Sequence, residues 1–261
     1  MSYATDLMIA IAQFISQSAL WVRVSTLGVV LLGLWFGLGR AGFQGKARRS
    51  RWLAVAIPIV GWLATIWVLA LADAFASRPP IVWGKIPATL LVGYIISLVI
   101  LLRSKTMAAV LDATPPSWLF GIQLVRFGGL AFLLPTLAGR MPASFGLPAG
   151  GGDTLVALLA IPVALYFSSG APGRWVVAYA FNVFGMSVFA LNLAIGAVLF
   201  WSGHPIVALT SFPTVMLPTF GAPFTLLLHS MSIWQLRRLA RRSAPATASR
   251  PLTQLRLRDV N

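Results

Sequence analysis

Residues 175–201 read WVVAYAFNVFGMSVFALNLAIGAVLFW, a run that contains no charged side chain. An α-helix needs about 20 predominantly apolar residues to cross the hydrocarbon core of a bilayer, and this run exceeds that length. Trp175 and Trp201 stand at its two ends, and tryptophan is enriched where a membrane helix meets the interface. The stretch therefore predicts a transmembrane helix.

The composition of the whole chain supports the same fold class. Of 261 residues, 58% are hydrophobic and 10% are charged, and the mean hydropathy is +0.86. A soluble domain carries about 25% charged residues, so this chain has too few to cover a water-facing surface. We expect an integral membrane protein with an all-α fold.

The apolar runs define the domain organisation. Seven candidate spans lie at residues 18–39, 52–73, 82–102, 118–138, 146–168, 175–201 and 212–236. We expect them to form one transmembrane domain over residues 18–242. Residues 1–17 lack the basic n-region of a signal peptide and are expected to form a helix that lies at the interface or extends the first span. Residues 243–261 are expected to be a disordered cytoplasmic tail.

The basic residues indicate the orientation. The chain has 20 Lys and Arg against 5 Asp and Glu, a net charge of +15. Most of the basic residues fall in the 40–51 and 103–105 segments, at Arg174 and after residue 236, which are all on one side of the predicted topology. Positive residues favour the cytoplasm, so the N-terminus is expected outside and the C-terminus inside a bacterial inner membrane. This pattern explains the charge without a nucleic-acid partner, and the expected partner is the lipid bilayer.

Gln123 and Arg126 are the first candidate site residues. Their spacing places both on one face of span four. Arg126 lies roughly 12 Å from the inner end of that span at a rise of 1.5 Å per residue. No Asp or Glu is expected at its depth, so its donors must bind neutral acceptors, water or an anionic ligand. The alternatives are an anion anchor and a structural arginine that binds carbonyls or extends towards the interface.

Asn182 and His229 are expected at a similar depth in spans six and seven. Together with Gln123 and Arg126 they predict a polar cluster in the inner third of the bundle. Thr225, His229 and Ser232 share one helix face. The cluster either binds a ligand or forms a hydrogen-bond network that only holds the helices together.

Asp153 follows three glycines in FGLPAGGGDT, residues 145–154. Glycine weakens a helix by about 1 kcal/mol relative to alanine, so the sequence predicts a break at residues 150–152 with Asp153 as the N-cap of a shorter helix. Such a helix start is either an anion site or a plain outer loop.

The outer half of span seven contains Pro213, Pro218, Gly221 and Pro223. Proline removes a backbone hydrogen bond, so this half is expected to kink or unwind, as a hinge or a binding groove. Proline is also simply more common in membrane helices than in soluble ones.

Several chemistries are excluded by the residues that are missing. The chain has no cysteine, which excludes thiolate metal sites and disulfides. Its two histidines are predicted too far apart in depth to share a haem, and no lysine is expected deep in a span to bind retinal. No cofactor and no metal are expected.

Two motifs resemble a family of uncharacterised bacterial polytopic membrane proteins. The pattern F-x-L-P-A-G-x-G-D is present at residues 145–153, and P-T-F-x-x-P-x-x-x-L-L-H-x-x-S-x-x-Q-L is present at residues 218–236. The resemblance covers roughly residues 115–240. It implies that Asp153 and His229 are site residues without assigning an activity to them.

Three functions remain open at this point. The leading hypothesis is a non-enzymatic protein that binds or transports a small anionic or lipid-like ligand through its last four spans. The second is an accessory or structural subunit that binds a partner protein within a membrane complex. The third is an intramembrane enzyme that uses His229 as its base, with Arg126 holding an anion.

Overall fold

The computed structural model describes residues 3–75, 84–204, 206–210 and 212–243, and these residues form helices and turns without a strand. The predicted tail at 243–261 lies outside the described residues apart from Ser243. The helices, in chain order, are α1 (Tyr3–Arg40), α2 (Gly45–Leu71), α3 (Lys85–Arg103), α4 (Lys105–Ala113), α5 (Ser117–Gly121), η1 (Ile122–Gly129), α6 (Leu130–Leu137), α7 (Ala143–Gly146), η2 (Leu147–Gly151), α8 (Gly152–Ser168), α9 (Arg174–Trp201), η3 (Val207–Leu209), η4 (Leu217–Gly221) and α10 (Ala222–Ser243).

Five helical segments are long and apolar enough to cross a membrane. They are Gly45–Leu71, Lys85–Arg103, Ser117–Leu137, Ala143–Ser168 and Arg174–Trp201, and they match five of the predicted spans. The all-helical fold of a membrane protein is thereby supported. The other two predicted spans lie in α1, where the apolar segment Val24–Arg40 is shorter, and in α10, which is not among the five. In α1, residues 3–17 continue into residues 18–39 as one helix.

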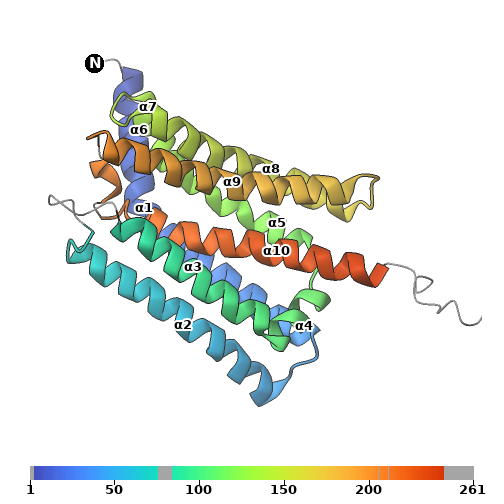
Figure 1. Cartoon of the computed structure of the whole chain (residues 1–261). Coiled ribbons are helices and arrows are strands. Elements are labelled where there is room, and N and C mark those ends of the chain that lie inside the picture. The colour runs from blue at the N-terminus through green and yellow to red at the C-terminus, as the bar shows by residue number, and fades with distance from the viewer. Residues whose placement is uncertain (1–2, 76–83, 205, 211, 244–261) are drawn as a thin grey trace, which may run out of the picture.

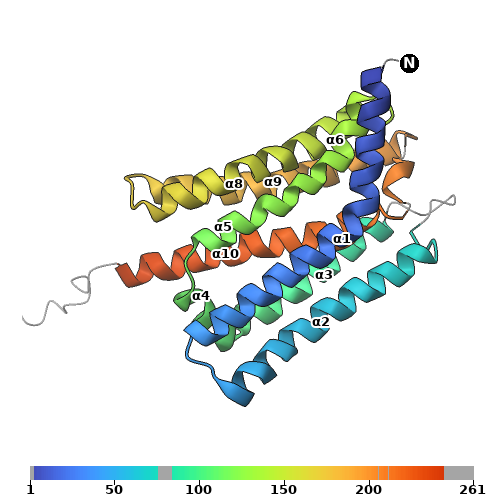
Figure 2. The ribbon, with the colours of Figure 1, turned by 180° about the vertical axis from the view of Figure 1, so that it is seen from behind.

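Helix α10 lies in the middle of the bundle. It packs against α3, α4, α5 and α9 (Figures 1 and 2). Between residues 222 and 236, every side chain except those of Ser230, Ile233 and Trp234 is buried. The polar residues Thr225, His229, Ser232 and Gln235 lie among these buried positions.

The outer faces of the bundle are apolar. Leu165 on α8 is 67% exposed, and Val176 and Val198 on α9 are 72% and 65% exposed. Water-soluble monomers rarely expose contiguous apolar surface on this scale, whereas lipid tails solvate it. A polar central helix inside an apolar rim is the arrangement expected of a bundle surrounded by lipid.

The predicted break at residues 150–152 is wrong. The chain stays helical from Ala143 to Ser168, with one π-helical segment, η2, between two α-helical ones. Glycine is tolerated here because it lets backbones approach: a Cβ on Gly150 would collide with the backbone nitrogen and Cβ of Leu133, and one on Gly146 with Thr136. Gly146 and Gly150 form the G-x-x-x-G spacing common where membrane helices touch. Asp153 is not an N-cap, since it lies within the first turn of α8. The residue at the N-cap position of α8 is Gly151, and its backbone dihedrals are helical.

The middle of span four is a 3₁₀-helix. Segment η1 joins α5 to α6 without a break in helical structure and is eight residues long. Such helices rarely exceed three or four residues, and a longer stretch inside a helix often marks a strained or functional segment. This segment carries Gln123 and Arg126.

The outer half of predicted span seven departs from regular α-helix, as its prolines indicate. Residues 212–215 form a turn, Pro218 and Gly221 belong to the π-helical segment η4, and Pro223 is the second residue of α10. A hinge function for these residues stays a prediction.

The most basic segments gather at one end of the bundle. The α1–α2 turn, α4, the α8–α9 turn and the end of α10 lie at the same end (Figure 1). There Asp112 of α4 pairs with Arg238 and Arg242 of α10. The hydrogen bond from Arg238 lowers the pKa of the Asp112 carboxyl below its ordinary value of 3.8 and raises the pKa of Arg238. Asp112 therefore stays ionised at neutral pH and attaches α4 to the end of α10.

Candidate functional site

The site begins with a row of residues on η1. A 3₁₀-helix has 3.0 residues per turn, so residues three apart lie directly above one another. Gln123, Arg126 and Gly129 form such a row, and all three are buried. The tighter helix therefore aligns one amide, one guanidinium and one glycine along a single line that faces the bundle interior.

Arg126 has a counter-ion, contrary to the sequence-based expectation. Its Nε donates to Asp153 Oδ1 over 2.9 Å, and Nη2 donates to the same oxygen. Asp153 and Arg126 lie at the same depth in the bundle because the helical segment that carries Asp153 runs unbroken from Ala143. Asp153 lies ten residues after that start, and Arg126 lies eleven residues before the end of α6 at Leu137. Gly129 permits the approach, since a Cβ there would collide with the Asp153 side chain.

The rest of the guanidinium is held by three other groups. Nη1 donates to the backbone oxygen of Gly185 over 2.8 Å and contacts His229 Nε2 at 3.1 Å. The guanidinium carbon also lies 4.2 Å from the centre of the Phe189 ring, a cation–π distance. Arg126 thus points into the bundle and reaches His229, as expected from sequence.

The polar network beyond Arg126 has a fixed direction. A guanidinium can only donate, so His229 Nε2 accepts and the ring carries its proton on Nδ1. That Nδ1–H donates to Asn182 Oδ1 over 3.0 Å, and Asn182 Nδ2 donates to Ser232 Oγ over 3.1 Å. Every step from Arg126 to Ser232 therefore runs from donor to acceptor, and His229 is neutral.

Gln123 is not part of this hydrogen-bond network. Its Nε2 reaches the backbone oxygen of Thr225 at 3.5 Å, the limit of a hydrogen bond, and its buried Oε1 has no partner. Four of the five predicted site residues, Arg126, Asp153, Asn182 and His229, are therefore joined in one network, and Gln123 lies beside it.

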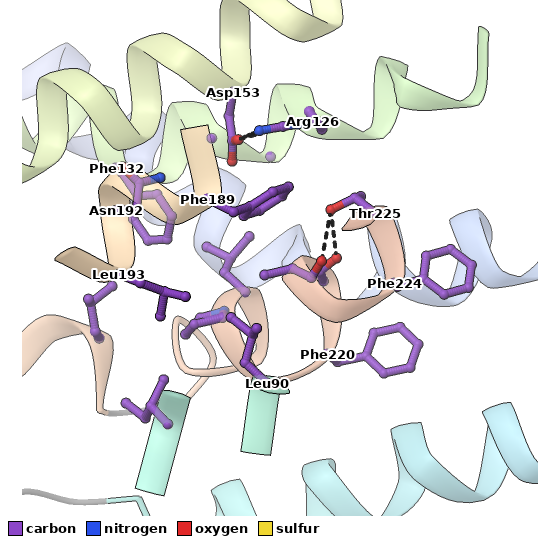
Figure 3. Close-up of a pocket in the computed structure, with 18 of the residues that line it drawn as sticks. Leu90, Arg126, Phe132, Asp153, Phe189, Asn192, Leu193, Phe220, Phe224 and Thr225 are labelled. Atoms are coloured by element: carbon purple, nitrogen blue, oxygen red, sulfur yellow. Dashed lines mark hydrogen bonds and ion pairs between the residues drawn. The ribbon is translucent and has the colours of Figure 1, made fainter. Parts of the chain in front are cut away.

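A cavity of about 140 Å³ opens on one side of the ion pair. Figure 3 shows Arg126 and Asp153 on one wall, Phe189 and Asn192 next to them, and Leu90 and Phe220 across the space. Among the described residues that line the cavity, only Arg126 and Asp153 are charged, and most of the others are apolar. The Arg126 side chain is 1% exposed and that of Asp153 is 14% exposed, so the carboxylate is the accessible member of the pair.

Of the predicted hinge residues, Pro218 and Gly221 line the cavity and Pro213 and Pro223 do not. His229 and Asn182 do not line it either, and lie behind Arg126. In the described part of the chain, no three acidic or histidine side chains are grouped as metal ligands would be.

Two further polar residues were not among the predicted site residues, although Gln235 belongs to the motif at residues 218–236. Asn192 lines the cavity, and its buried Oδ1 has no hydrogen-bond partner. Gln235 is fully buried and donates through Nε2 to the backbone oxygens of Leu111 and Thr114, both over 2.6 Å. A helical-face pattern could have found both, because Asn192 shares the face of Asn182, Gly185 and Phe189, and Gln235 that of Ser232.

Comparisons with known proteins identify a family domain that contains the site. A family model described as a domain of unknown function (DUF8737) matches residues 85–237, more than half of the chain. No curated protein and no solved structure matches. The matched segment contains η1, α8, α9 and the buried part of α10, and hence the whole network from Arg126 to Ser232. The chain therefore belongs to the DUF8737 family.

Proposed function

We propose that the protein binds a small molecule with an apolar body and one anionic group, and that it does so to carry that molecule across or into the membrane. The observation that supports this most directly is the position of the Arg126–Asp153 pair on the wall of a mostly apolar cavity. Ionisable residues inside a membrane bundle are rare and mark ligand or ion pathways. Arg126 would bind the anionic group, and the aromatic walls would enclose the apolar body.

The size of the cavity limits the ligand. A buried cavity of roughly 150 Å³ accommodates benzene, and this cavity has a volume of about 140 Å³. A benzene-sized body therefore nearly fills this cavity, and its carboxylate or sulfonate would have to occupy the space at Arg126, whereas a whole phospholipid does not fit.

The membrane arrangement that we propose has seven spans. The five apolar segments supply five of them, and α1 and α10 would supply the first and the last. The basic end of the bundle would face the cytoplasm of a bacterium, with the N-terminus outside the inner membrane.

The geometry gives the enzyme alternative no support. His229 is exposed neither to water nor to the cavity. Its exposed fraction is 0%, and both of its ring nitrogens already have partners. A general base must reach the proton that it removes from a substrate.

The test is the binding of benzoate to the protein in lipid nanodiscs, measured by calorimetry with empty nanodiscs as the reference. We expect wild-type protein to bind benzoate, and Arg126→Leu to bind it at least tenfold more weakly, because a hydrogen bond to a charged group contributes about 1.5–3 kcal/mol. Leu193→Trp, which fills the cavity, should also abolish binding.

Two controls separate binding from folding. Arg238→Leu removes an arginine that is paired with an aspartate outside the cavity, and it should bind benzoate normally. The double variant Arg126→Leu/Asp153→Asn leaves no unpaired charge and should fold yet fail to bind. Equal benzoate affinity in wild type, the double variant and Leu193→Trp would disprove the proposed function.

A further inference from the structure

Asp153 occupies the place that an anionic ligand would need. Both Nε and Nη2 of Arg126 are directed at Asp153 Oδ1, and the other hydrogen bonds of the guanidinium go from Nη1 to Gly185 and His229. An anion that reached Arg126 from the cavity would therefore meet the Asp153 carboxylate first. The ligand can bind Arg126 fully only if the carboxylate moves aside.

The charges around the cavity do not permit this exchange without a proton. Arg126 of η1 and Asp153 of α8 balance each other. The residues of α1, α3, α9 and η4 that line the cavity are uncharged. His229 of α10, which faces Arg126, is neutral. An added anion would give the site a net negative charge in an apolar surrounding, where an unpaired charge is strongly unfavourable. A proton taken up with the anion keeps the net charge at zero.

The cavity also offers a place for that proton. A protonated carboxyl group gains one O–H donor. Asn192 lines the same cavity, and its buried Oδ1 has no partner. Asp153 and Asn192 both lie on the cavity wall in Figure 3. The unpartnered amide oxygen is an acceptor that the ion-paired state does not use.

On this basis, and resting on the function proposed above, we propose that ligand binding is coupled to protonation of Asp153. The anion replaces the Asp153 carboxylate at Arg126, and one proton from water binds the released carboxylate, which becomes neutral and donates to Asn192. The exchange conserves charge: one anion and one proton enter, and one ion pair is replaced by another. Asp153 thus acts as an internal anion that holds the site when the ligand is absent.

The test uses benzenesulfonate, because this anion stays ionised throughout the range from pH 6 to pH 8, so that any proton taken up must bind the protein. Binding to wild-type protein in nanodiscs is measured by calorimetry at pH 6, 7 and 8, in pairs of buffers with different ionisation enthalpies. We expect uptake of one proton per anion and a tenfold loss of affinity for each unit of pH.

The variant that isolates the carboxylate is Asp153→Asn. It should bind benzenesulfonate without proton uptake and with an affinity that does not change between pH 6 and pH 8. Asp112→Asn is the matched control, because it alters an aspartate that is paired with an arginine outside the cavity, and it should retain the wild-type pH dependence. The proton count in wild-type protein remains decisive if Asp153→Asn does not fold.

Three results would overturn the inference. Binding to wild-type protein without proton uptake would place the anion beside an intact ion pair. Uptake of a proton with benzoate, together with no binding of benzenesulfonate, would mean that the ligand carries the proton. Wild-type pH dependence in Asp153→Asn would assign the proton to another group. The absence of benzoate binding in wild-type protein is a separate outcome, since it removes the proposed function itself.

Discussion

The position of Arg126 shows how a single buried cation is tolerated at membrane depth. Its partners are one carboxylate, one backbone carbonyl, one imidazole nitrogen and one aromatic face. A charged residue at the centre of a membrane helix costs about 2.5–3.5 kcal/mol when it is unpaired. Here each of the three guanidinium nitrogens has at least one acceptor, and the side chain is buried, so the residue can remain ionised without contact with lipid.

Gly185 provides the space for this arrangement, and its replacement should disrupt it. A Cβ at position 185 would collide with the ring of His229 and lie 3.1 Å from Arg126 Nη1. We expect Gly185→Ala to lower the free energy of unfolding by about 1–3 kcal/mol, because neither hydrogen-bonded group can move without losing a partner. Thermal unfolding of the purified protein, followed by circular dichroism, measures the change.

The control for this substitution is Gly61→Ala on α2, where nothing lies within 4 Å of the new methyl group. It should leave the unfolding temperature unchanged or raise it slightly. Equal effects of the two substitutions would show that the contact around Gly185 is not tight.

Sequence reasoning located most of the polar residues of the site but not their pairing. The spacing of Gln123 and Arg126 and the similar depth of Asn182 and His229 predicted a cluster, and three of these four side chains are in contact. The partner of Arg126 was missed because Asp153 was assigned to an outer break in span five. A single error about the glycines thus turned a neutral ion pair into an apparently unpaired cation. Whether the cluster binds a ligand stays a prediction.

At the scale of elements, the two π-helical segments in the described part of the chain share a sequence pattern. Both π-helical segments read Leu-Pro-x-x-Gly: LPAGG in η2 and LPTFG in η4. Each is followed directly by a long α-helix, α8 or α10, that carries a site residue. Proline and glycine were interpreted from sequence as signs of a break or a kink. The structure shows that proline and glycine also occur where a π-helix changes to an α-helix without a break in helical structure.

The glycines of η2 offer a matched pair of substitutions. Gly150 lies against the backbone of α6, whereas a Cβ on Gly151 would have nothing within 4 Å. We expect Gly150→Ala to destabilise the protein by about 1–3 kcal/mol through overpacking. Gly151→Ala should be neutral or stabilising by about 0.5–1 kcal/mol, because alanine is the better helix former.

Denaturation in a mixed detergent system, with the helical signal as the readout, compares the two variants. If instead Gly151→Ala is the more damaging of the two, residues 150–152 are not helical in the folded protein. The sequence alone could not rank them, because helix propensities describe a glycine in water and not one packed against a second helix.

At the scale of the whole molecule, the fold class followed from composition, since a chain with 10% charged residues has few alternatives to a membrane bundle. The positions of five helices followed from their length and hydropathy. The central place of α10 did not, because the sequence predicted only that one face of span seven, with His229, joins a polar cluster, whereas the structure buries nearly every side chain from residue 222 to residue 236. Its burial depends on contacts with helices that are distant in the chain.

The orientation of the bundle is testable with reporter fusions. The basic segments at one end of the molecule predict that this end faces the cytoplasm. Reporters inserted in the α1–α2 turn, at residues 41–44, and after Ser243 should both be active in the cytoplasm, and a reporter in the α6–α7 turn, at residues 138–142, should be active outside. Activity on opposite sides for the first two positions would contradict the arrangement of seven spans.

The central position of α10 has a consequence for how the protein is made. Among the described residues, each helix that packs against α10 precedes it in the chain and is synthesised before it. Entering lipid alone, α10 would expose Thr225, His229, Ser232 and Gln235 to hydrocarbon, where polar groups lack partners. If it enters after these helices, Asn182 and the carbonyls of Leu111 and Thr114 are already in place to bind its polar side chains. For the described helices, the order of the sequence therefore predicts an order of assembly, in which a polar helix packs into a site that the helices before it have formed.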